Sequence, residues 1–275
     1  IYREVLEESP ENGAITIRTL DIGGDKTVPF MGRTQQEANP FMGWRSIRLS
    51  FEHPQFFQTQ IRAIMRAAAK TSKDQSARSV KMMFPMVTNV EELRRLRKIT
   101  RKAEQQLKSE NLDFGRVEFG MMLEVPAAAI MIDRMLPAVD FVSIGSNDLV
   151  QYMMAADRDN PKVSHLCQPL SPAVLRILES VVKTCNEFGK PVTLCGEMAG
   201  QPQAFVLLLG MGLRRFSMSP AFIPTIKELA SQISMSTAKE LLELSKKQNT
   251  TRRVQNVITK ALLELVPKLQ PVLMQ

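Results

Sequence analysis

Residues 117–148 read VEFGMMLEVPAAAIMIDRMLPAVDFVSIGSND, and this stretch decides the fold. It contains two short apolar runs, 117–123 and 141–145, separated by a segment of helical character. Pro126 follows the first run at a position that the first turn of a helix tolerates. Two short strands joined by a helix are the repeating unit of a parallel α/β fold.

The same alternation continues in both directions along the chain. Short apolar or β-branched runs are followed by loops rich in Gly, Asn, Asp or Pro, and then by amphipathic helices such as 57–68 and 174–188. Seven strands are expected, at 14–20, 46–50 (the weakest), 80–85, 117–123, 141–145, 192–195 and 215–218. The length of 275 residues suits one (β/α)8 TIM-type barrel, a fold of about 250 residues. The fold class is therefore predicted as α/β.

Boundary signals agree with this register. A capping-box arrangement at 88–92 opens a helix directly after the strand 80–85, and the Ser- and Lys-rich segment 70–79 indicates a surface loop. From residue 237 onward the apolar spacing is purely helical. We therefore expect a barrel over 1–236 and a helical C-terminal extension of the same domain over 237–275, acting as a cap or an oligomer contact.

Composition excludes several classes of protein. No run of about 18 uncharged apolar residues exists, and the N-terminus lacks the features of a signal peptide, so a cytoplasmic protein without a membrane span is expected. The net charge of +8 comes from basic residues scattered along amphipathic segments without interleaved aromatics. This pattern favours a small anionic substrate over nucleic acid. The cysteines, Cys167, Cys185 and Cys195, fit neither a metal spacing nor a disulfide framework.

Carboxylates and an amide follow two of the expected strands. Glu124 comes directly after the strand 117–123, and Asn147 and Asp148 follow the strand 141–145. Parallel α/β folds bind ligands at the carboxyl ends of their strands, and Mg²⁺ usually takes one or two protein carboxylates. Glu124 and Asp148 are therefore candidate magnesium ligands. The structural alternative is a helix cap, with Asp148 as the N-cap of a helix that begins at Leu149.

Three arginines and a thiol lie in comparable positions. Arg18 precedes the glycine-containing segment 21–26, Arg45 follows Trp44, Arg158 lies in a charged loop, and Cys195 ends the strand 192–195. Each also has an ordinary explanation: a plain turn, an arginine stacked on tryptophan, a surface ion-pair cluster, and a small core cysteine. Their common location at strand ends favours a binding site.

Together these blocks resemble the phosphoenolpyruvate-utilising family over almost the whole chain. The resemblance is carried, in order and spacing, by RTLDIGGDK at 18–26, EANP at 37–40 with GWR at 43–45, FPM at 84–86, EVP at 124–126, GSNDL at 145–149 with QY at 151–152, and CGEMAG at 195–200. The last block is similar to the enzyme I branch of the phosphotransferase system. Pyruvate phosphate dikinase has a histidine after the glutamate, and phosphoenolpyruvate synthase departs further.

The resemblance implies a role for each candidate residue. Arg18 and Arg45 would hold the phosphate of phosphoenolpyruvate, and Asn147 and Arg158 the other substrate oxygens. Glu124 and Asp148, itself close to substrate, would hold Mg²⁺. Cys195 would protonate the enolpyruvate carbon, because a thiol with an ordinary pKa of about 8.5 can supply that proton.

Two parts of the family pattern are not found in these residues. Neither His53 nor His165 lies in the Gly-rich Thr-Ser-His context of the phosphoacceptor domain. The family barrel also has a first strand, ending in arginine and glutamate, before the helix that 2–8 would complete. Seven expected strands, where a closed barrel needs eight, agree with this. We therefore expect a fragment that lacks the first barrel strand and one phosphate-binding arginine.

The leading hypothesis is an enzyme domain that binds phosphoenolpyruvate and Mg²⁺. In the full-length protein it would phosphorylate a histidine of an N-terminal domain, which passes the group to a histidine-containing carrier protein, with release of pyruvate. Alternatives are the equivalent domain of a pyruvate phosphate dikinase or phosphoenolpyruvate synthase-like enzyme, and a non-catalytic dimerisation or regulatory barrel. A pyruvate-forming aldolase or lyase is disfavoured by Arg45 and the Cys195 block. The resemblance also implies a homodimer.

Overall fold

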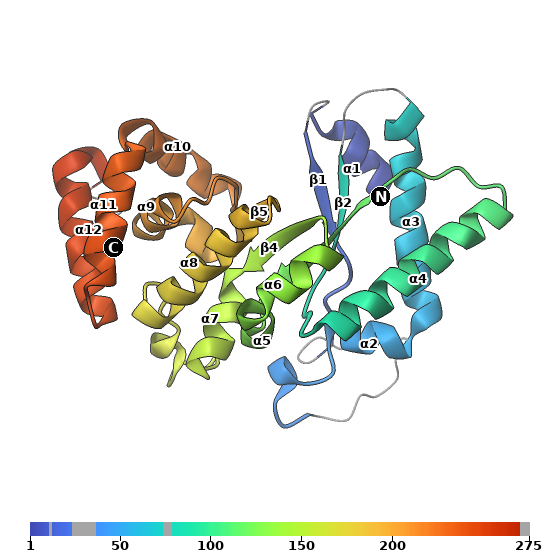
Figure 1. Cartoon of the computed structure of the whole chain (residues 1–275), viewed down its shortest axis with the longest axis horizontal. Helices are drawn as coiled ribbons and strands as arrows, with labels where there is room; N and C mark the ends of the chain where they lie inside the picture. Colours follow the sequence, from blue (N-terminus) through green and yellow to red (C-terminus); the bar gives the residue numbers. More distant parts are fainter. Residues whose placement is uncertain (11–12, 24–36, 74–78, 270–275) are drawn as a thin grey trace. The chain divides into compact units, whose positions relative to one another are not determined.

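The computed structural model describes residues 1–10, 13–23, 37–73 and 79–269. For residues 70–73 and 269 it describes the backbone alone. Its chain forms two compact units, Ile1–Met122 with Pro137–Phe141, and Leu123–Leu136 with Val142–Gln275. Strands and helices alternate through both of them (Figure 1).

The first unit is built on three parallel strands in chain order. β1 (Ile15–Arg18) pairs with β2 (Val80–Phe84), and β2 pairs with β3 (Glu118–Leu123). Four helices belong to this unit: α1 (Tyr2–Glu8), α2 (Ser46–Glu52), α3 (Pro54–Lys73) and α4 (Val90–Ser109). α3 packs against α1, α2 and α4, so it is the central helix of the unit.

The sequence signals explain most of these elements. The apolar stripe of α3, from Phe57 to Ala68, is buried as expected. Asn89 caps α4 in a reciprocal capping box, accepting a hydrogen bond from the Glu92 N–H at 2.9 Å. Glu92 also accepts from the Thr88 N–H at 2.6 Å, so the segment after β2 turns sharply into the helix.

Two expectations for this unit were wrong. Residues 46–50, expected as a strand, lie in α2, where the Ser50 hydroxyl donates to the Ser46 carbonyl at 3.0 Å. The alternating Ile47 and Leu49 suggested a strand, but so short an apolar run does not separate strand from helix. The expected loop at 70–79 begins later, because α3 continues to Lys73. Residues 74–78 of that loop lie outside the described residues.

The second unit repeats the same arrangement. β4 (Phe141–Gly145) pairs in parallel with β5 (Val192–Cys195), and β5 pairs with β6 (Phe216–Ser217). The helices that accompany these strands are α5 (Pro126–Ile130), α6 (Ile132–Met135), α7 (Ser146–Met154), α8 (Pro172–Glu187) and α9 (Pro202–Gly210). α8 buries the expected face from Val174 to Cys185, whereas Phe188, beyond its end, is 46% exposed.

Three α-helices follow β6 among the described residues. α10 (Ile223–Gln232), α11 (Met235–Lys246) and α12 (Thr251–Leu265) follow one another, and all three contact α9 (Figure 1). Their packing explains why α9 is apolar on nearly all sides: neighbours cover it all round. The helical character expected from residue 237 onward is confirmed up to residue 269, and residues 270–275 lie outside the described residues.

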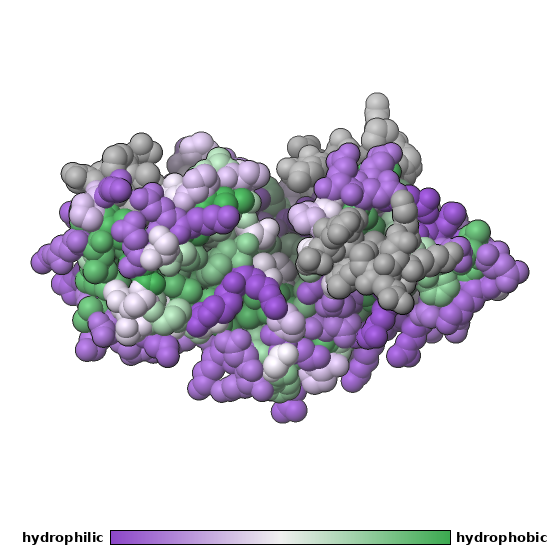
Figure 2. All heavy atoms as spheres, turned by 90° about the horizontal axis from the view of Figure 1, so that it is seen from above, coloured by the Kyte–Doolittle hydropathy of each residue, from purple (hydrophilic) through white to green (hydrophobic). Residues whose placement is uncertain are grey.

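The expected α/β class is confirmed, with helical crossovers between parallel strands that follow chain order. The described residues contain six strands instead of seven, since 46–50 is helical. Hydrophilic side chains cover much of the surface in view (Figure 2). Within the described ranges, no helix combines the length and the apolar character needed to cross a membrane.

Candidate functional site

In the first unit, two of the predicted arginines converge on one carboxylate. Arg18 is the last residue of β1, and its Nη1 lies 3.1 Å from Asp21 Oδ2. Arg45 Nη2 lies 3.1 Å from both carboxylate oxygens of Asp21. The Ser46 hydroxyl donates to Asp21 Oδ1 as well. The Arg45 and Asp21 side chains are only 10% and 5% exposed, whereas Arg18 is 44% exposed.

The backbone brings these residues together over a long stretch of sequence. Gly23 forms an isolated antiparallel bridge with Arg45, and the Ser46 N–H donates to the Ile22 carbonyl at 2.9 Å. Gly23 has a φ of +107°, and a Cβ there would lie 2.3 Å from the Trp44 carbonyl oxygen. Only glycine fits this approach. The rest of the predicted glycine segment, residues 24–26, lies outside the described residues.

The Asp21 carboxyl is held in its charged form. Burial by itself raises its pKa, but the Ser46 hydrogen bond and the positive charges of Arg45 and Arg18 outweigh burial and lower the pKa below the ordinary 3.8. The pair with Arg45 is therefore an ion pair in a nearly buried environment. The alternative interpretation of Arg45, a surface arginine stacked on Trp44, is therefore wrong, because its side chain is nearly buried.

In the second unit, the two candidate magnesium ligands are both buried. Glu124 is the first residue after β3 and is 2% exposed, and Asp148 lies in the first turn of α7 and is 8% exposed. Gly145 is the N-cap of α7, so Asp148 is not the cap that the alternative reading assigned to it. Buried carboxylates are costly unless they bind cations or hydrogen-bond donors. Two such oxygen donors fit the modest protein contribution that Mg²⁺ requires. No cluster of three or more His, Cys, Asp or Glu suited to a metal occurs among the described residues.

Arg158 approaches one of these carboxylates. Its Nη1 lies 3.6 Å from Asp148 Oδ1, and its backbone N–H donates to the buried Gln151 Oε1 at 3.1 Å. Ala155, with a φ of +50°, ends α7 and turns the chain into the Arg158 loop. The amide of Gln151 therefore fixes the start of that loop beside Asp148.

Cys195 lies where β5 ends, level with the end of β4. Its register partner is Gly145, immediately before α7. Its thiol donates to the Ile144 carbonyl at 3.3 Å and accepts from the Ser143 hydroxyl at 3.4 Å. A carbonyl acceptor keeps a proton on the sulfur, which suits an acid. Cys185, in contrast, is buried within α8, and burial raises the pKa of its thiol to about 12.

Asn147 is oriented by the segment that follows Cys195. The Glu197 N–H donates to Asn147 Oδ1 at 3.1 Å, and Asn147 Nδ2 donates to Glu197 Oε1 at 3.4 Å. Gly196 makes this pairing possible, because its φ of +110° and ψ of −177° belong to a region that only glycine adopts readily. The Ser146 hydroxyl donates to the Cys195 carbonyl at 2.8 Å and ties the two loops together.

These loops enclose a small polar pocket of about 120 Å³ in the second unit. It is lined by Ser146, Asn147, Val150, Arg158, Cys167, Pro169, Glu197, Met198 and Gln201. Predicted residues Asn147 and Arg158 thus meet at one cavity.

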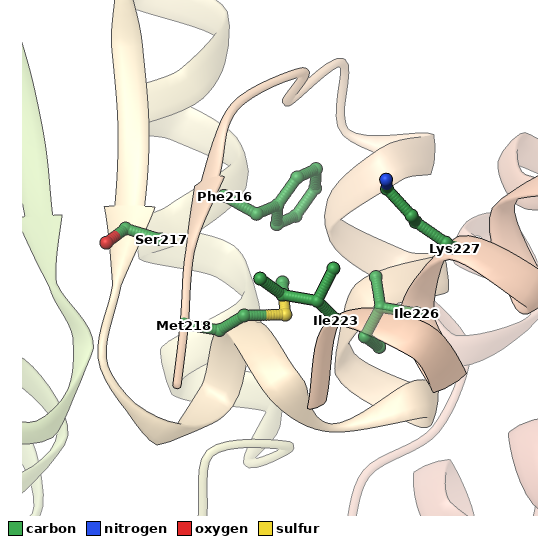
Figure 3. Close-up of a pocket in the computed structure, with 6 residues that line it drawn as sticks. All are labelled: Phe216, Ser217, Met218, Ile223, Ile226 and Lys227. Atoms are coloured by element: carbon green, nitrogen blue, oxygen red, sulfur yellow. The ribbon is translucent and has the colours of Figure 1, made fainter. Parts of the chain in front are cut away.

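A larger pocket of about 410 Å³ lies beside β6 (Figure 3). Apolar side chains gather on one side of the strand, Lys227 stands at the edge, and Ser217 points to the other side (Figure 3). None of the predicted site residues lines this second pocket.

Gly196→Ala tests the geometry of this loop. A Cβ at residue 196 would lie 2.4 Å from Ser146 Oγ and 2.8 Å from Asn147 Oδ1, so it should push Asn147 aside. We expect a loss of about 1–3 kcal/mol in the free energy of unfolding, measured with urea. Gly189→Ala is the matched control, because residue 189 also has a positive φ, +63°, but its Cβ would meet nothing within 4 Å. Equal losses in the two variants would show that backbone strain alone is responsible.

The structure brings the predicted residues together in two groups. Arg18 and Arg45 meet on Asp21 in the first unit, and Asn147, Asp148, Arg158 and Cys195 lie on adjoining loops of the second, which also contains Glu124. Sequence reasoning gave no role to three partners that orient them, Asp21, Gln151 and Glu197. All three lay inside the quoted motifs, and that position was the available signal.

Parallel strands in chain order, with charged and polar residues at their carboxyl ends, define a ligand-binding α/β domain of the barrel type. The family model described as PEP-utilising enzyme, PEP-binding domain, matches residues 1–235. The chain therefore belongs to the family of phosphoenolpyruvate-utilising enzymes and contains their phosphoenolpyruvate-binding domain.

Similar proteins agree with this assignment, and each of the following is named phosphoenolpyruvate-protein phosphotransferase. The chain is 42% identical to the protein of Buchnera aphidicola from Acyrthosiphon pisum, covering 93% of this chain and 43% of the relative. It is 41% identical to that of Listeria monocytogenes, covering 94% and 44%. It is 41% identical to that of Bacillus subtilis, covering 92% and 43%. The chain thus spans less than half the length of these relatives. A solved citrate lyase from Burkholderia xenovorans has a TM-score of 0.45 and 14% identity, covering 78% of this chain and 69% of that one.

Proposed function

We propose that this chain binds phosphoenolpyruvate with Mg²⁺ and, within its full-length protein, supplies the phosphoryl group to a histidine. That histidine would belong to an N-terminal domain and would pass the group to a histidine-containing carrier protein, with release of pyruvate. The observation that carries the proposal is the pair Arg18 and Arg45, fixed within 3.1 Å of the same buried carboxylate. Relatives that match over 90% of this chain are named phosphoenolpyruvate-protein phosphotransferase, and that name supports the proposed reaction.

The arginines would receive the phosphate. A guanidinium carries five N–H donors in a planar fork that matches phosphate oxygens, and it stays charged at all relevant pH values. Transfer of a phosphoryl group depends mainly on positioning and on neutralising charge, which fixed arginines provide. In the second unit, Arg158 and Asn147 would bind the remaining oxygens of the substrate.

Glu124 and Asp148 would hold the magnesium ion. Mg²⁺, when bound, would neutralise charge on substrate oxygens and so favour loss of the phosphoryl group. Cys195 would then protonate the enolpyruvate carbon, since its thiol proton lies on an accessible strand end. The protein would work in the cytoplasm and form a homodimer, as the family resemblance implies.

Calorimetry of this chain with phosphoenolpyruvate, with and without Mg²⁺, tests the binding proposal. We expect saturable binding that is at least tenfold tighter when Mg²⁺ is present, because Glu124 and Asp148 would hold an ion that neutralises negative charge on the substrate. Pyruvate and inorganic phosphate serve as control ligands, each of which can fill only part of the site. Absence of binding to phosphoenolpyruvate at millimolar concentration in both conditions would contradict the proposal for this chain.

A further inference from the structure

Asp21 is the carboxylate that both arginines contact, and the function proposed above gives it no task in binding the substrate. Its two oxygens receive contacts from Arg18, Arg45 and Ser46, and its side chain is 5% exposed. We propose that Asp21 is a positioning residue that sets the spacing and direction of the two guanidinium groups that receive the phosphate of the substrate. This inference rests on the proposed function.

The charges explain why such a residue is needed. Two guanidinium groups close enough to grip one phosphate repel each other before the phosphate arrives. A carboxylate between them offsets one of the two charges and leaves a net positive site for an anion. Because each long arginine side chain loses rotamer freedom on binding, an arginine that is already held loses less.

Each arginine contacts Asp21 through a terminal nitrogen of its guanidinium group. Arg18 meets Asp21 through Nη1 alone, so the other nitrogens of its fork do not contact this carboxylate. Arg45 likewise meets Asp21 through Nη2. Asp21 therefore anchors one edge of the Arg18 fork, and an arginine anchored at one edge can direct its other edge to an anion.

Asp21 is in turn fixed by the fold. Ser46, whose hydroxyl contacts Oδ1, is the first residue of α2 and is completely buried. The hydrogen bond from the Ser46 N–H to the Ile22 carbonyl and the bridge between Gly23 and Arg45 hold the two segments together next to Asp21. A carboxylate held in one position in this way can orient the guanidinium groups of the two arginines.

Asp21→Asn is the informative substitution. The amide oxygen can replace Oδ1 and accept from Ser46, which puts an NH₂ group at the position of Oδ2, facing Arg18. Two donors then meet, and Arg18 must turn away. We expect phosphoenolpyruvate binding by this chain, in the presence of Mg²⁺, to weaken by about ten- to hundredfold.

Asp140→Asn is the matched control in the same unit. Asp140 accepts from the Phe119 N–H at 2.8 Å, and its carboxylate lies 3.8 Å from Arg97 Nη2, so it too forms an ion pair with an arginine. We expect this variant to bind phosphoenolpyruvate like the wild-type chain. Urea unfolding of both variants separates lost positioning from lost stability.

A double-mutant cycle with Arg18→Ala provides a second measurement that a purely structural role would not affect. If Asp21 acts through Arg18, Asp21→Asn should weaken binding much less when Arg18 is already absent. Equal weakening in both backgrounds, unchanged affinity in Asp21→Asn, or tighter binding, as expected for a carboxylate that competes with the phosphate, would overturn the proposal. A wild-type chain that fails to bind phosphoenolpyruvate would instead contradict the proposed function.

Discussion

Cys195→Ala is expected to lower pyruvate formation by the full-length protein by about 10²- to 10⁴-fold, the range for loss of a general acid or base. The binding of phosphoenolpyruvate should stay within a few-fold of the wild-type value. The physical reason is that the thiol hydrogen-bonds to the Ser143 hydroxyl and the Ile144 carbonyl of the neighbouring strand, and neither belongs to the proposed binding residues. Removing the sulfur therefore removes a proton donor and leaves the arginines and carboxylates in place.

The measurement is the rate at which pyruvate appears from phosphoenolpyruvate, with binding followed in parallel by calorimetry. Cys185→Ala is the control, because Cys185 is also a cysteine of the second unit but is completely buried within α8. Its loss should reduce stability slightly and leave the rate of pyruvate formation unchanged. A Cys195→Ala protein that makes pyruvate at the normal rate would exclude the thiol as the acid.

The parts of the fold that the sequence predicted correctly are those with a long or repeated pattern. The stripe of α3 and the capping box of α4 each rest on several residues that agree with one another, so tertiary context cannot easily override them. Residues 46–50 had no such support. Ile47 and Leu49 alternate over too short a distance to separate a strand from a helix, and the segment forms α2.

The candidate site shows the same division. Glu124, Asp148 and Cys195 could be predicted from their positions at the ends of expected strands, because parallel strands place their carboxyl ends at one edge of the sheet. The partners that orient these residues could not be predicted in this way. Asp21 meets Arg45 across 24 positions, and Glu197 meets Asn147 across 50, and no local pattern encodes such contacts.

Arg45→Ala is expected to be the most damaging substitution in the first unit. Arg45 and Asp21 are both nearly buried, so truncation leaves a buried carboxylate without its principal cation. Breaking a buried pair in this way typically costs about 3–5 kcal/mol. We expect a loss near the lower end, about 3 kcal/mol, since Arg18 and Ser46 still contact the carboxylate. Binding of phosphoenolpyruvate should be lost as well, and urea unfolding and calorimetry measure the two effects.

Arg18→Ala separates the two consequences. Arg18 contacts the same carboxylate, but its side chain is 44% exposed, and exposed ion pairs contribute at most about 1 kcal/mol. This variant should therefore weaken binding strongly while the free energy of unfolding changes little. If both arginine variants lost the same stability, burial of the Arg45 pair would not be the cause.

The pH dependence of the Arg45→Ala effect follows from the carboxyl of Asp21. Its pKa in the folded protein is lowered, since burial, which raises it, is outweighed by the Ser46 hydrogen bond and by the charges of Arg45 and Arg18. A lowered folded pKa contributes stability that is present above the ordinary value of 3.8 and is lost as the pH falls through the folded pKa. The difference in unfolding free energy between the wild-type chain and Arg45→Ala should therefore be largest near neutral pH. It should shrink as the solution is acidified below about pH 4, because a protonated Asp21 no longer needs its cation. A difference that stays constant over this range would assign the loss to packing of the Arg45 side chain instead of to its charge.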